Sequence, residues 1–454
     1  MQILYANGST THSAFGLYNN TNEHHAKGES VMFIKRDGPK FSKVVTVTKY
    51  LQLIIIDEYS TLWDELLLMV DKQLRFIRGN DLPFGGCDVI LCGHFLQLKP
   101  TIGRSLMYAF FDNNLFGEIL RSFKRSVLKE QMRASEDKFQ EKLVSRLANY
   151  RDYPQPIDRK LLSSSCQYCE ADSQPTASCE HLHFLTKQDI INDKSWIIAP
   201  LVGFTHQSID YTLLERIKTF AIANNSFVMM WRLDSNESRK NQVDISSLTD
   251  EAAKSYVELW GFFVPNLPVR IDQNINIDAR IVNGTKGVLT SIRPQNPDKL
   301  RNIYSDSNIK AGDIVIIEQP IGVFIKCEEA VPGFEEIFMV QCDLTKTLTN
   351  DRRSKTFKSI LNEIKLNIYI KSPGYQCTLG GTDYSVQGYT LPKVIIDLNK
   401  DPNYTRMSLN DFIVCFTRTK NSKNCRIMPF NYNSGIEHLL KLEHADIYIL
   451  GSVL

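Results

Sequence analysis

The chain of 454 residues has almost no excess of charge and no long hydrophobic run. Its 53 lysines and arginines against 51 aspartates and glutamates leave a net charge of +2, so contact with nucleic acid would need local basic clusters. No run approaches the ~20 apolar residues that span a bilayer, and the start, Met1 to Gly8, lacks the basic and apolar regions of a secretory signal. These absences predict a soluble, intracellular protein.

The cysteines match neither a disulfide framework nor a regular zinc site. Ten cysteines occur, and several stand singly in apolar runs, where a small buried thiol is the usual role. We therefore expect a reducing compartment. Residues 163–183 do contain zinc-ligand types, but the order Cys-x-His-x-His lacks the usual histidine spacing. We therefore expect a loop there that does not bind zinc. The possible ligands in it are Cys166, Cys169, Cys179, His181 and His183.

A hydrophobic stretch that ends in two acids is the clearest chemical feature. Leu53 to Ile56 are four large aliphatic residues, and Asp57 and Glu58 follow directly. Such a run predicts a parallel strand covered on both faces, whose acids lie at the carboxyl edge of the sheet, where ligands bind. One carboxylate could hold the water shell of Mg²⁺ while the other activates a water for nucleoside triphosphate hydrolysis. Taken alone, the pattern fits equally well a strand that enters a polar loop.

The neighbouring segments predict an α/β protein with two larger units. Residues 44–50 alternate like a strand, residues 62–77 have helical spacing, and a second apolar strand over residues 88–93 leads to Gln97. Another α/β unit begins near residue 196, and a hairpin pattern with short strands follows it. We predict a first core over residues 1–150, a linker or insertion over 151–194 and a second core over 195–454, with a β-rich insertion at about 265–372.

Two later blocks add polar groups to this plan. Gly380 to Leu391 is rich in glycine, threonine and glutamine and precedes the apolar strand Val394 to Leu398. Arg418 follows an apolar run that begins after Asp411. An arginine so placed could reach across a domain interface to stabilise charge on a transferring phosphoryl group, although it could also be an ordinary ion-pairing residue.

Taken together and in this order, the blocks resemble the motifs of the Pif-one-like branch of superfamily 1 DNA helicases. The resemblance covers nearly the whole chain and implies an α/β fold of two tandem RecA-like parallel-sheet cores, with a small SH3-like insertion in the second. The matching segments, in chain order, are residues 8–17, 53–60, 93–100, 128–133, 282–287, 382–391 and 416–418.

The resemblance also implies a role for each matched residue. Asp57 would hold Mg²⁺ through water, and Glu58 would be the general base. The other residues implied at the ATP site are Gln97, Arg133, Gln387, Gly388 and Arg418. The residues implied to contact single-stranded DNA are Thr11, His12, Phe15, Thr382 and Thr390. The implied activity is ATP-driven movement, 5′ to 3′, on single-stranded or forked DNA, in the nucleus or the mitochondrion and without a membrane partner.

Two departures from the family pattern leave two hypotheses open. The family's phosphate loop should lie just before Gly8, and no Gly-x-x-x-x-Gly-Lys-Ser/Thr occurs in the 454 residues, so ATP binding and hydrolysis should be severely reduced. His94 also stands where the family has aspartate. The chain is therefore either a helicase whose start lies upstream, or an inactive remnant that binds single-stranded DNA or acts as a scaffold. A nuclease is disfavoured, because the Asp57–Glu58 pair is not part of a larger carboxylate cluster.

Overall fold

A computed structural model describes the chain in segments. These are residues 9–19, 31–128, 132–134, 136–148, 185–204, 206–233, 235–237, 257–272, 274–276, 279–328, 337–341, 353–358, 365–370, 373–398 and 408–428. The five residues considered as zinc ligands lie outside them. Within the described segments, no helix is both long enough and apolar enough to cross a membrane.

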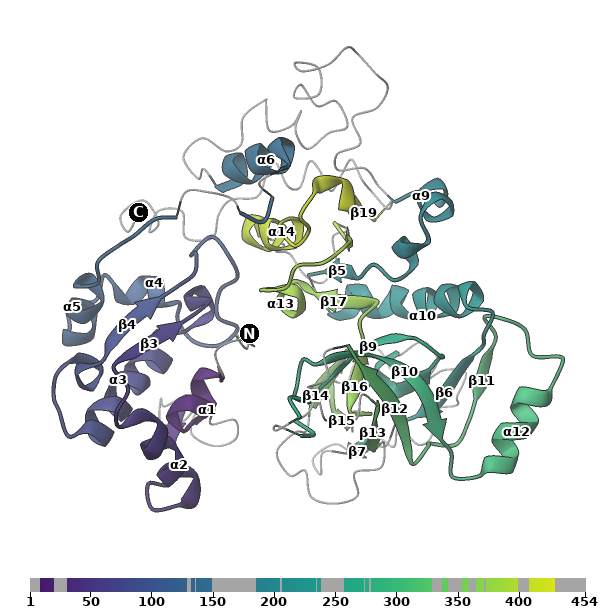
Figure 1. Ribbon diagram of the computed structural model, residues 1–454, viewed down its shortest axis with the longest axis horizontal. Coiled ribbons are helices and arrows are strands. Elements are labelled where there is room, and N and C mark those ends of the chain that lie inside the picture. Colours follow the sequence, from purple (N-terminus) through teal and green to yellow (C-terminus); the bar gives the residue numbers. More distant parts are fainter. Residues whose placement is uncertain are drawn as a thin grey trace, which may run out of the picture.

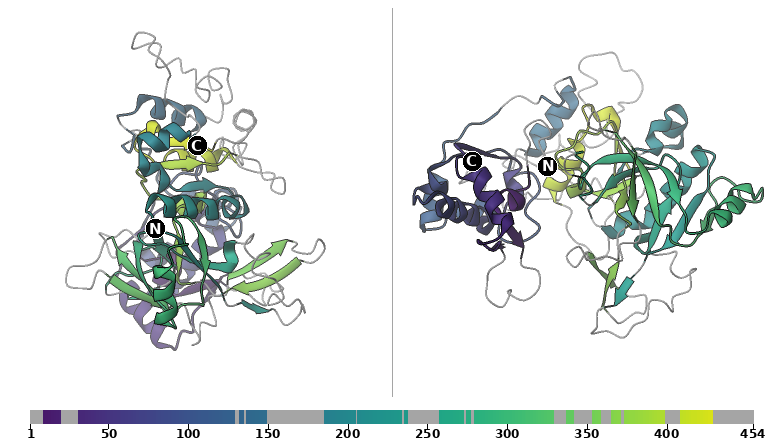
Figure 2. Two further views of the ribbon diagram at one scale, coloured as in Figure 1. Left: turned by 90° about the vertical axis from the view of Figure 1, so that its right-hand side faces the viewer. Right: turned by 60° about the horizontal axis from the view of Figure 1, so that its bottom comes forward.

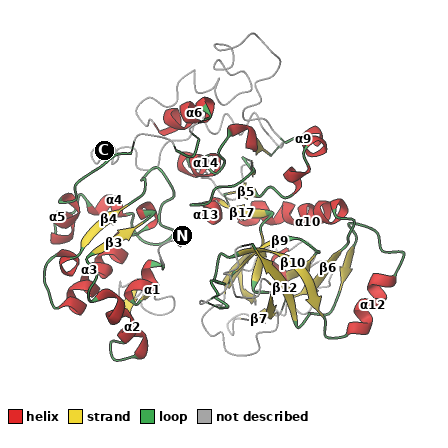
Figure 3. Cartoon of the chain, in the orientation of Figure 1, coloured by secondary structure: helices red, strands yellow, loops and turns green. Residues whose placement is uncertain are grey.

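The first core is built on two parallel strands and the helix between them. Strand β3 (Leu53–Ile56) pairs with β4 (Asp88–Leu91), and α3 (Asp64–Arg78) connects them. Figure 1 shows this core in purple and blue at the left, and Figure 3 shows how much of it is helical. The shorter elements around it are α1 (Thr11–Phe15), β1 (Leu17–Asn19), β2 (Val31–Phe33), α2 (Pro39–Thr48), α4 (Leu106–Ala109) and α5 (Leu115–Arg121).

Helix α3 confirms the helix predicted over residues 62–77. Leu66, Val70 and Leu74 are buried at a spacing of four residues, so they form one apolar stripe that packs into the first core. Asp64 lies in the first turn, where the helix dipole favours negative charge. Gly79 ends the helix in the left-handed conformation, with φ of 58°, which glycine adopts without steric cost.

Residues 44–50 do not form the predicted strand, because most of them belong to helix α2. Pro39 starts this helix in its first turn, a position where proline is well tolerated. Phe41, Val44 and Thr48 are its buried residues, and their spacing of three and four is that of a helix. Val44 to Thr48 are all β-branched, a composition that favours a strand, but the tertiary contacts follow the helical period.

Among the described residues, just one face of the sheet in the first core is covered. This corrects the expectation of a strand buried on both faces. Ile54 and Ile56 are each 7% exposed, whereas Leu53 and Ile55 are 45% and 56% exposed. Ile90 on β4 is 46% exposed. The parallel pairing with β4 nevertheless places the carboxyl ends of both strands at the same edge, where the acids follow β3.

The second core contains a four-stranded parallel sheet in the order β17-β5-β18-β19. Parallel sheets in both cores agree with the predicted α/β class. The strands are β5 (Leu201–Gly203), β17 (Gly380–Thr382), β18 (Val394–Ile396) and β19 (Cys425–Ile427). The helices that accompany them are α10 (His206–Ala223), α13 (Asp383–Val386) and α14 (Leu409–Phe416).

Helix α6 (Lys138–Ala148) packs with this second core, although the predicted boundary at residue 150 assigns it to the first. Gln140 donates from Nε2 to the carbonyl of Phe416 at 3.0 Å, and Asp137 accepts from the backbone N–H of Ser422 at 2.7 Å. Apolar residues of α6 share a hydrophobic cluster with α14 and β18. These contacts favour a boundary before α6, and the other domain limits stay predictions.

A larger set of mostly antiparallel strands adjoins the parallel sheet, with β11 and β6 as a parallel pair within it. A five-stranded sheet has the order β13-β12-β10-β9-β16, and a three-stranded sheet, β11-β6-β8, shares its hydrophobic core. Figure 2 shows these green strands from two further directions, with the β14–β15 hairpin extending to one side. The remaining elements are β6 (Val228–Arg232), β7 (Ser235–Glu237), β8 (Trp260–Phe263), β9 (Pro268–Ile271), β10 (Lys286–Arg293), α12 (Pro297–Ser305), β11 (Ile314–Ile316), β12 (Gly322–Cys327), β13 (Ile337–Gln341), β14 (Arg353–Lys358), β15 (Lys365–Ile370) and β16 (Tyr375–Cys377). Strands thus occupy the region predicted to be β-rich, while the SH3-like character stays a prediction.

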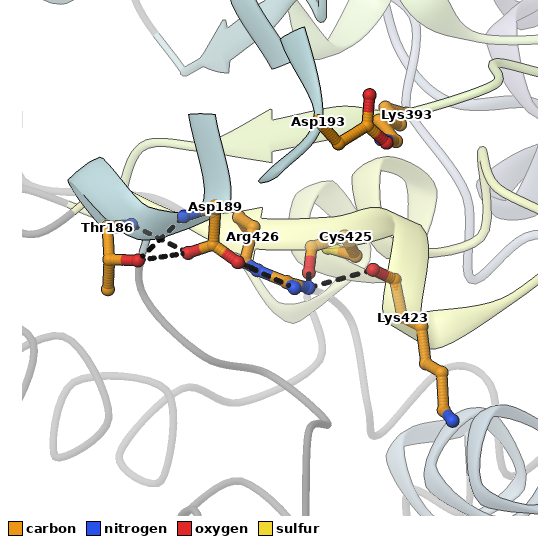
Figure 4. A network of polar contacts seen from close by, with 7 residues as sticks. All are labelled: Thr186, Asp189, Asp193, Lys393, Lys423, Cys425 and Arg426. Carbon is orange, nitrogen blue, oxygen red and sulfur yellow. Dashed lines mark hydrogen bonds and ion pairs between the residues drawn. The ribbon is translucent and has the colours of Figure 1, made fainter. Parts of the chain in front are cut away.

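A polar network fastens helix α9 (Lys187–Asn192) to the edge strand β19 (Figure 4). Asp189 completes a capping box with Thr186 and accepts from Arg426 Nη2 at 3.0 Å. The Arg426 guanidinium also lies over the ring of Trp196, 4.9 Å from its centroid. Arg426 is 9% exposed, and this pairing gives its buried charge both an anion and an aromatic face.

Candidate functional site

The two acids after β3 lie in a tight turn that the neighbouring strand holds in place. The backbone N–H of Glu58 donates to Asp57 Oδ1 at 2.9 Å, and the N–H of Tyr59 donates to the carbonyl of Cys92, after β4, at 3.0 Å. Glu58 has φ of 55°, in the left-handed region that residues other than glycine rarely adopt. The turn therefore ends the strand at once and directs the two half-buried carboxylates differently.

Gln387 of the second core contacts Glu58 directly. Its Nε2 donates to Glu58 Oε2 at 3.0 Å, so two residues that are 329 positions apart share a hydrogen bond. Gln387 follows the last residue of α13, and Gly388 continues in the left-handed region with φ of 78°. The structure thus brings together Glu58 and Gln387, which the sequence predicted for one site.

Two predicted arginines lie beside this contact. Arg133 donates from Nη1 to the carbonyl of Thr417 at 3.1 Å. Arg418 is 2% exposed and donates to residues at the end of its own helix, from Nε to the Val414 carbonyl at 2.6 Å and from Nη2 to Thr417 Oγ1 at 2.9 Å.

The charges of these arginines are linked to that of Glu58. The pKa of Arg418 is lowered to about 10, first by burial and then by the positive charge of Arg133, while the Glu58 carboxylate acts in the opposite direction. Burial also lowers the pKa of Arg133, again opposed by Glu58. Both guanidinium groups stay protonated near pH 7, so Glu58 stands in the field of two positive charges.

The loop over residues 93–100 carries Gln97 to the same region. Asn410 of α14 donates from Nδ2 to the carbonyls of Phe95 at 3.4 Å and Gln97 at 3.2 Å. Tyr384 of α13 donates from its hydroxyl to the carbonyl of Lys99 at 2.9 Å. Among the described residues, no hydrogen-bond partner reaches the buried Oε1 of Gln97. The loop is therefore anchored by its backbone and keeps one amide oxygen available to a ligand.

His94 stands where the family has aspartate, and its side chain makes a hydrogen bond that aspartate could also make. Its Nδ1 accepts from the backbone N–H of Leu96 at 3.0 Å, a bond that a carboxylate oxygen could also accept. Desolvation lowers the pKa of His94, and the charge of Arg125 lowers it further, so the imidazole keeps its lone pair at neutral pH. This explains how the turn can form without an acid.

The residues predicted to contact DNA lie on both cores. Thr11 and His12 are half-buried on α1, and the His12 ring lies 5.7 Å from that of Trp63. Phe15 is 4% exposed and belongs to the first core, so a contact with DNA at this helix would fall to its neighbours. In the second core, Thr382 precedes α13, and Thr390 is exposed after it.

Sequence reasoning missed the residues that join these motifs. Asn410 and Tyr384 bind loop carbonyls, and such contacts leave no mark in the sequence. A signal did exist for the start of α14, because Ser408 and Asp411 have the spacing of a capping box, and the structure contains that box. This signal would have placed Asn410 in the first turn of a helix.

The side chains present fit part of a site for ATP and Mg²⁺. Asp57 and Glu58 supply carboxylates, Gln97 supplies the unpaired amide oxygen, and the two arginines supply positive charge. Within the described segments, no group of three or more histidines, cysteines or acids could hold a metal ion. A magnesium ion would therefore be held mainly through water and through phosphate oxygens of the nucleotide, as is common for this ion.

Comparisons with known proteins show a similarity to PIF1-like helicases over part of the chain. The family model of the PIF1-like helicases matches residues 2–159. An uncharacterised protein, 030L, of Invertebrate iridescent virus 6 is 27% identical over 426 residues, which is 88% of this chain and 76% of that protein. The ATP-dependent DNA helicase PIF5 of Trypanosoma brucei brucei is 52% identical over 57 residues, 13% of this chain and 6% of the helicase.

The fold is similar to that of a solved helicase. The crystal structure of Bacteroides Pif1 bound to single-stranded DNA aligns over 95% of this chain and 81% of that one, with a TM-score of 0.52 and 15% identity. At this identity the likeness concerns the fold, and it supports the predicted RecA-like α/β architecture. The match to the trypanosome helicase is confined to a short part of that much longer protein.

Asn410 provides a test of how the two cores are joined. We predict that Asn410→Asp lowers the free energy of unfolding by about 1–3 kcal/mol, because it replaces a buried donor by an acceptor facing two carbonyl oxygens. Urea unfolding measures the change. Asn296→Asp is the matched control, since Asn296 caps α12 through its side-chain oxygen and aspartate caps equally well. Equal losses in both variants would contradict the assigned contacts.

Proposed function

We propose that this chain acts in an ATP-dependent DNA helicase, because the PIF1-like helicase model matches residues 2–159. The observation that carries the proposal is the hydrogen bond between Glu58 and Gln387, with Arg133 and Arg418 beside it. The site combines acids from one core with an amide and a guanidinium from the other. The fit of a nucleotide bound there would depend on how the two cores are placed relative to each other.

Each side chain has a definite task in the proposed reaction. ATP and Mg²⁺ supply the phosphoryl group and the charge that polarises it. Asp57 would bind the water shell of the metal, and Glu58 would accept a proton from the attacking water. Arg133 and Arg418 would oppose negative charge that develops on the phosphoryl oxygens, and Gln97 would orient a ligand through its free amide oxygen.

DNA would contact α1 of the first core and the segment around α13 of the second core. Gln387 lies between Thr382 and Thr390, two of the residues proposed to contact a single strand or a fork. A shift of this segment on DNA binding would move Gln387 relative to Glu58. This supplies a physical route from DNA to the hydrolytic residues, through one short helix.

A second candidate function is a helicase relative that binds single-stranded DNA without hydrolysing ATP. The observation in its favour is that the 454 residues contain no Gly-x-x-x-x-Gly-Lys-Ser/Thr, the segment whose amides and lysine hold the nucleotide phosphates. His94 in the aspartate position points the same way, although its hydrogen bond preserves the turn. Binding and hydrolysis therefore need separate tests. The cellular compartment stays a prediction.

For DNA binding, we predict that Thr390→Glu weakens the affinity for a fluorescent oligothymidylate about tenfold or more, because a carboxylate would face the phosphate backbone. Fluorescence anisotropy at fixed salt measures the dissociation constant. Thr219→Glu places the same charge on an exposed position of α10 and serves as the control. If both variants bind like the parent chain, Thr390 does not face DNA.

For hydrolysis, the chain is compared with a version that has a phosphate-loop segment joined in front of residue 1. We predict that DNA stimulates ATP hydrolysis only in the extended version, and that Glu58→Gln lowers its kcat by roughly 10²–10⁴-fold, the usual contribution of a general base. Glu118→Gln, an exposed change on α5, should leave the rate unaltered. An extended version that hydrolyses ATP normally with Gln at position 58 would overturn the role of Glu58.

A further inference from the structure

Two carboxyl groups meet where α13 packs on α14. Asp383 is the first residue of α13 and is 3% exposed, and its side chain shares a hydrogen bond with that of Asp411 in the first turn of α14. Ionised carboxylates only accept hydrogen bonds. A hydrogen bond between two of them therefore requires a proton on one.

The surroundings decide which of the two keeps the proton. Asp411 Oδ2 already accepts from the backbone N–H of Ser408 at 2.7 Å, within the capping box of α14, and this hydrogen bond favours the ionised carboxyl. Lys99 also favours the ionised form of Asp411. Asp383 is the more buried of the two, so we assign it as the protonated donor and Asp411 as the ionised acceptor.

The pKa values agree with this assignment. The pKa of Asp383 is raised to about 7, first by burial and then by the charge of Asp411. Burial also raises the pKa of Asp411, against the opposing effects of Ser408 and Lys99. Two other titratable groups face the pair. Burial raises the pKa of Tyr384 to about 12 and that of Cys415 well above its ordinary value, so both stay neutral near pH 7.

We propose that Asp383 and Asp411 share one proton and act as a positioning pair, which holds α13 against α14 and so keeps Gln387 on Glu58. The helix α13 is only four residues long, and Gln387 follows it directly. Neither acid touches the proposed nucleotide site through a hydrogen bond that the structure gives. Their effect is on the placement of α13.

Loss of the shared proton would loosen the junction. Two like charges would then face each other in a buried place without a donor between them, which is unfavourable. The same junction holds the loop of Gln97, through Tyr384 to the carbonyl of Lys99 and through Asn410 to the carbonyl of Gln97. A movement of α13 away from α14 would therefore reach both Gln387 and this loop.

The pair predicts a definite pH dependence of stability. Asp383 has a higher pKa in the folded chain than its ordinary 3.8, so folding takes up a proton between about pH 4 and pH 7. The contribution of this group to the free energy of unfolding is complete at low pH, falls as the pH rises through that window and then stays constant. Asp383→Asn supplies an amide donor to Asp411 at every pH and removes this fall.

The first test is thermal unfolding of the full chain at about pH 5 and about pH 8. We expect the advantage of Asp383→Asn over the parent in unfolding temperature to be larger at the higher pH than at the lower pH, by at least about 2 °C. Asp298→Asn, an exposed change on α12, should follow the parent at both. Parallel curves for the parent and Asp383→Asn, or an advantage that is smaller at the higher pH, would overturn the proposal.

A second measurement decides the matter even if the variant does not fold. In the parent chain labelled with ¹³C at aspartate carboxyl groups, NMR should show one carboxyl that titrates near neutral pH, far above the ordinary value of about 4. The signal should be absent in a folded Asp383→Asn. A parent chain whose aspartates all titrate below about pH 5.5 would refute the shared proton.

The effect on turnover rests on the proposed function and is separable from the pair itself. In the extended version, Asp383→Asn should flatten the decline of kcat between about pH 6.5 and pH 8.5, where the parent loses its shared proton. If no hydrolysis occurs at any pH, the proposed function fails, while unfolding and NMR still decide on the pair. A normal titration of Asp383 with an unchanged kcat profile would remove its positioning role.

Discussion

The hydrogen bond from Gln387 Nε2 to Glu58 Oε2 is the contact on which the rest of the site depends. It joins the acid that ends β3 to the short helix α13, and therefore one parallel sheet to the other. The turn around Glu58 is fixed by the bond from Tyr59 to Cys92 in the first core. Arg133 adds a second link through the carbonyl of Thr417. The two cores are thus joined by polar contacts with defined directions, which a ligand could break and remake.

Much of the first core could be predicted from residue patterns, because α3 and the parallel strands bury one regular face. The prediction failed at residues 44–50, where valines and threonines alternate in sequence but Phe41, Val44 and Thr48 are buried at helical spacing. The prediction also failed for Leu53 and Ile55, which are exposed among the described residues. An apolar strand sequence does not indicate whether one face or both faces will be covered. Local composition reports propensity, whereas burial is decided by distant segments.

For the site, the sequence indicated which residues carry chemistry but not how they are held together. Glu58, Gln387, Arg133 and Arg418 could be found from the order of motifs, and the structure gathers them at one place. Asn410 and Tyr384 could not, because their partners are backbone carbonyls. The roles of the matched residues stay predictions. What the geometry adds is a connection between the two cores, from α13 through Gln387 to Glu58.

Separation of DNA strands is the decisive measurement for the proposed helicase function, since a helicase must convert hydrolysis into movement along DNA. The measurement uses the version of the chain with a phosphate-loop segment and fluorescent duplexes that carry a single-stranded tail on either the 5′ or the 3′ side. We expect ATP-dependent separation of the 5′-tailed duplex, with little effect on the 3′-tailed one. Hydrolysis stimulated by DNA without separation of either duplex would contradict it.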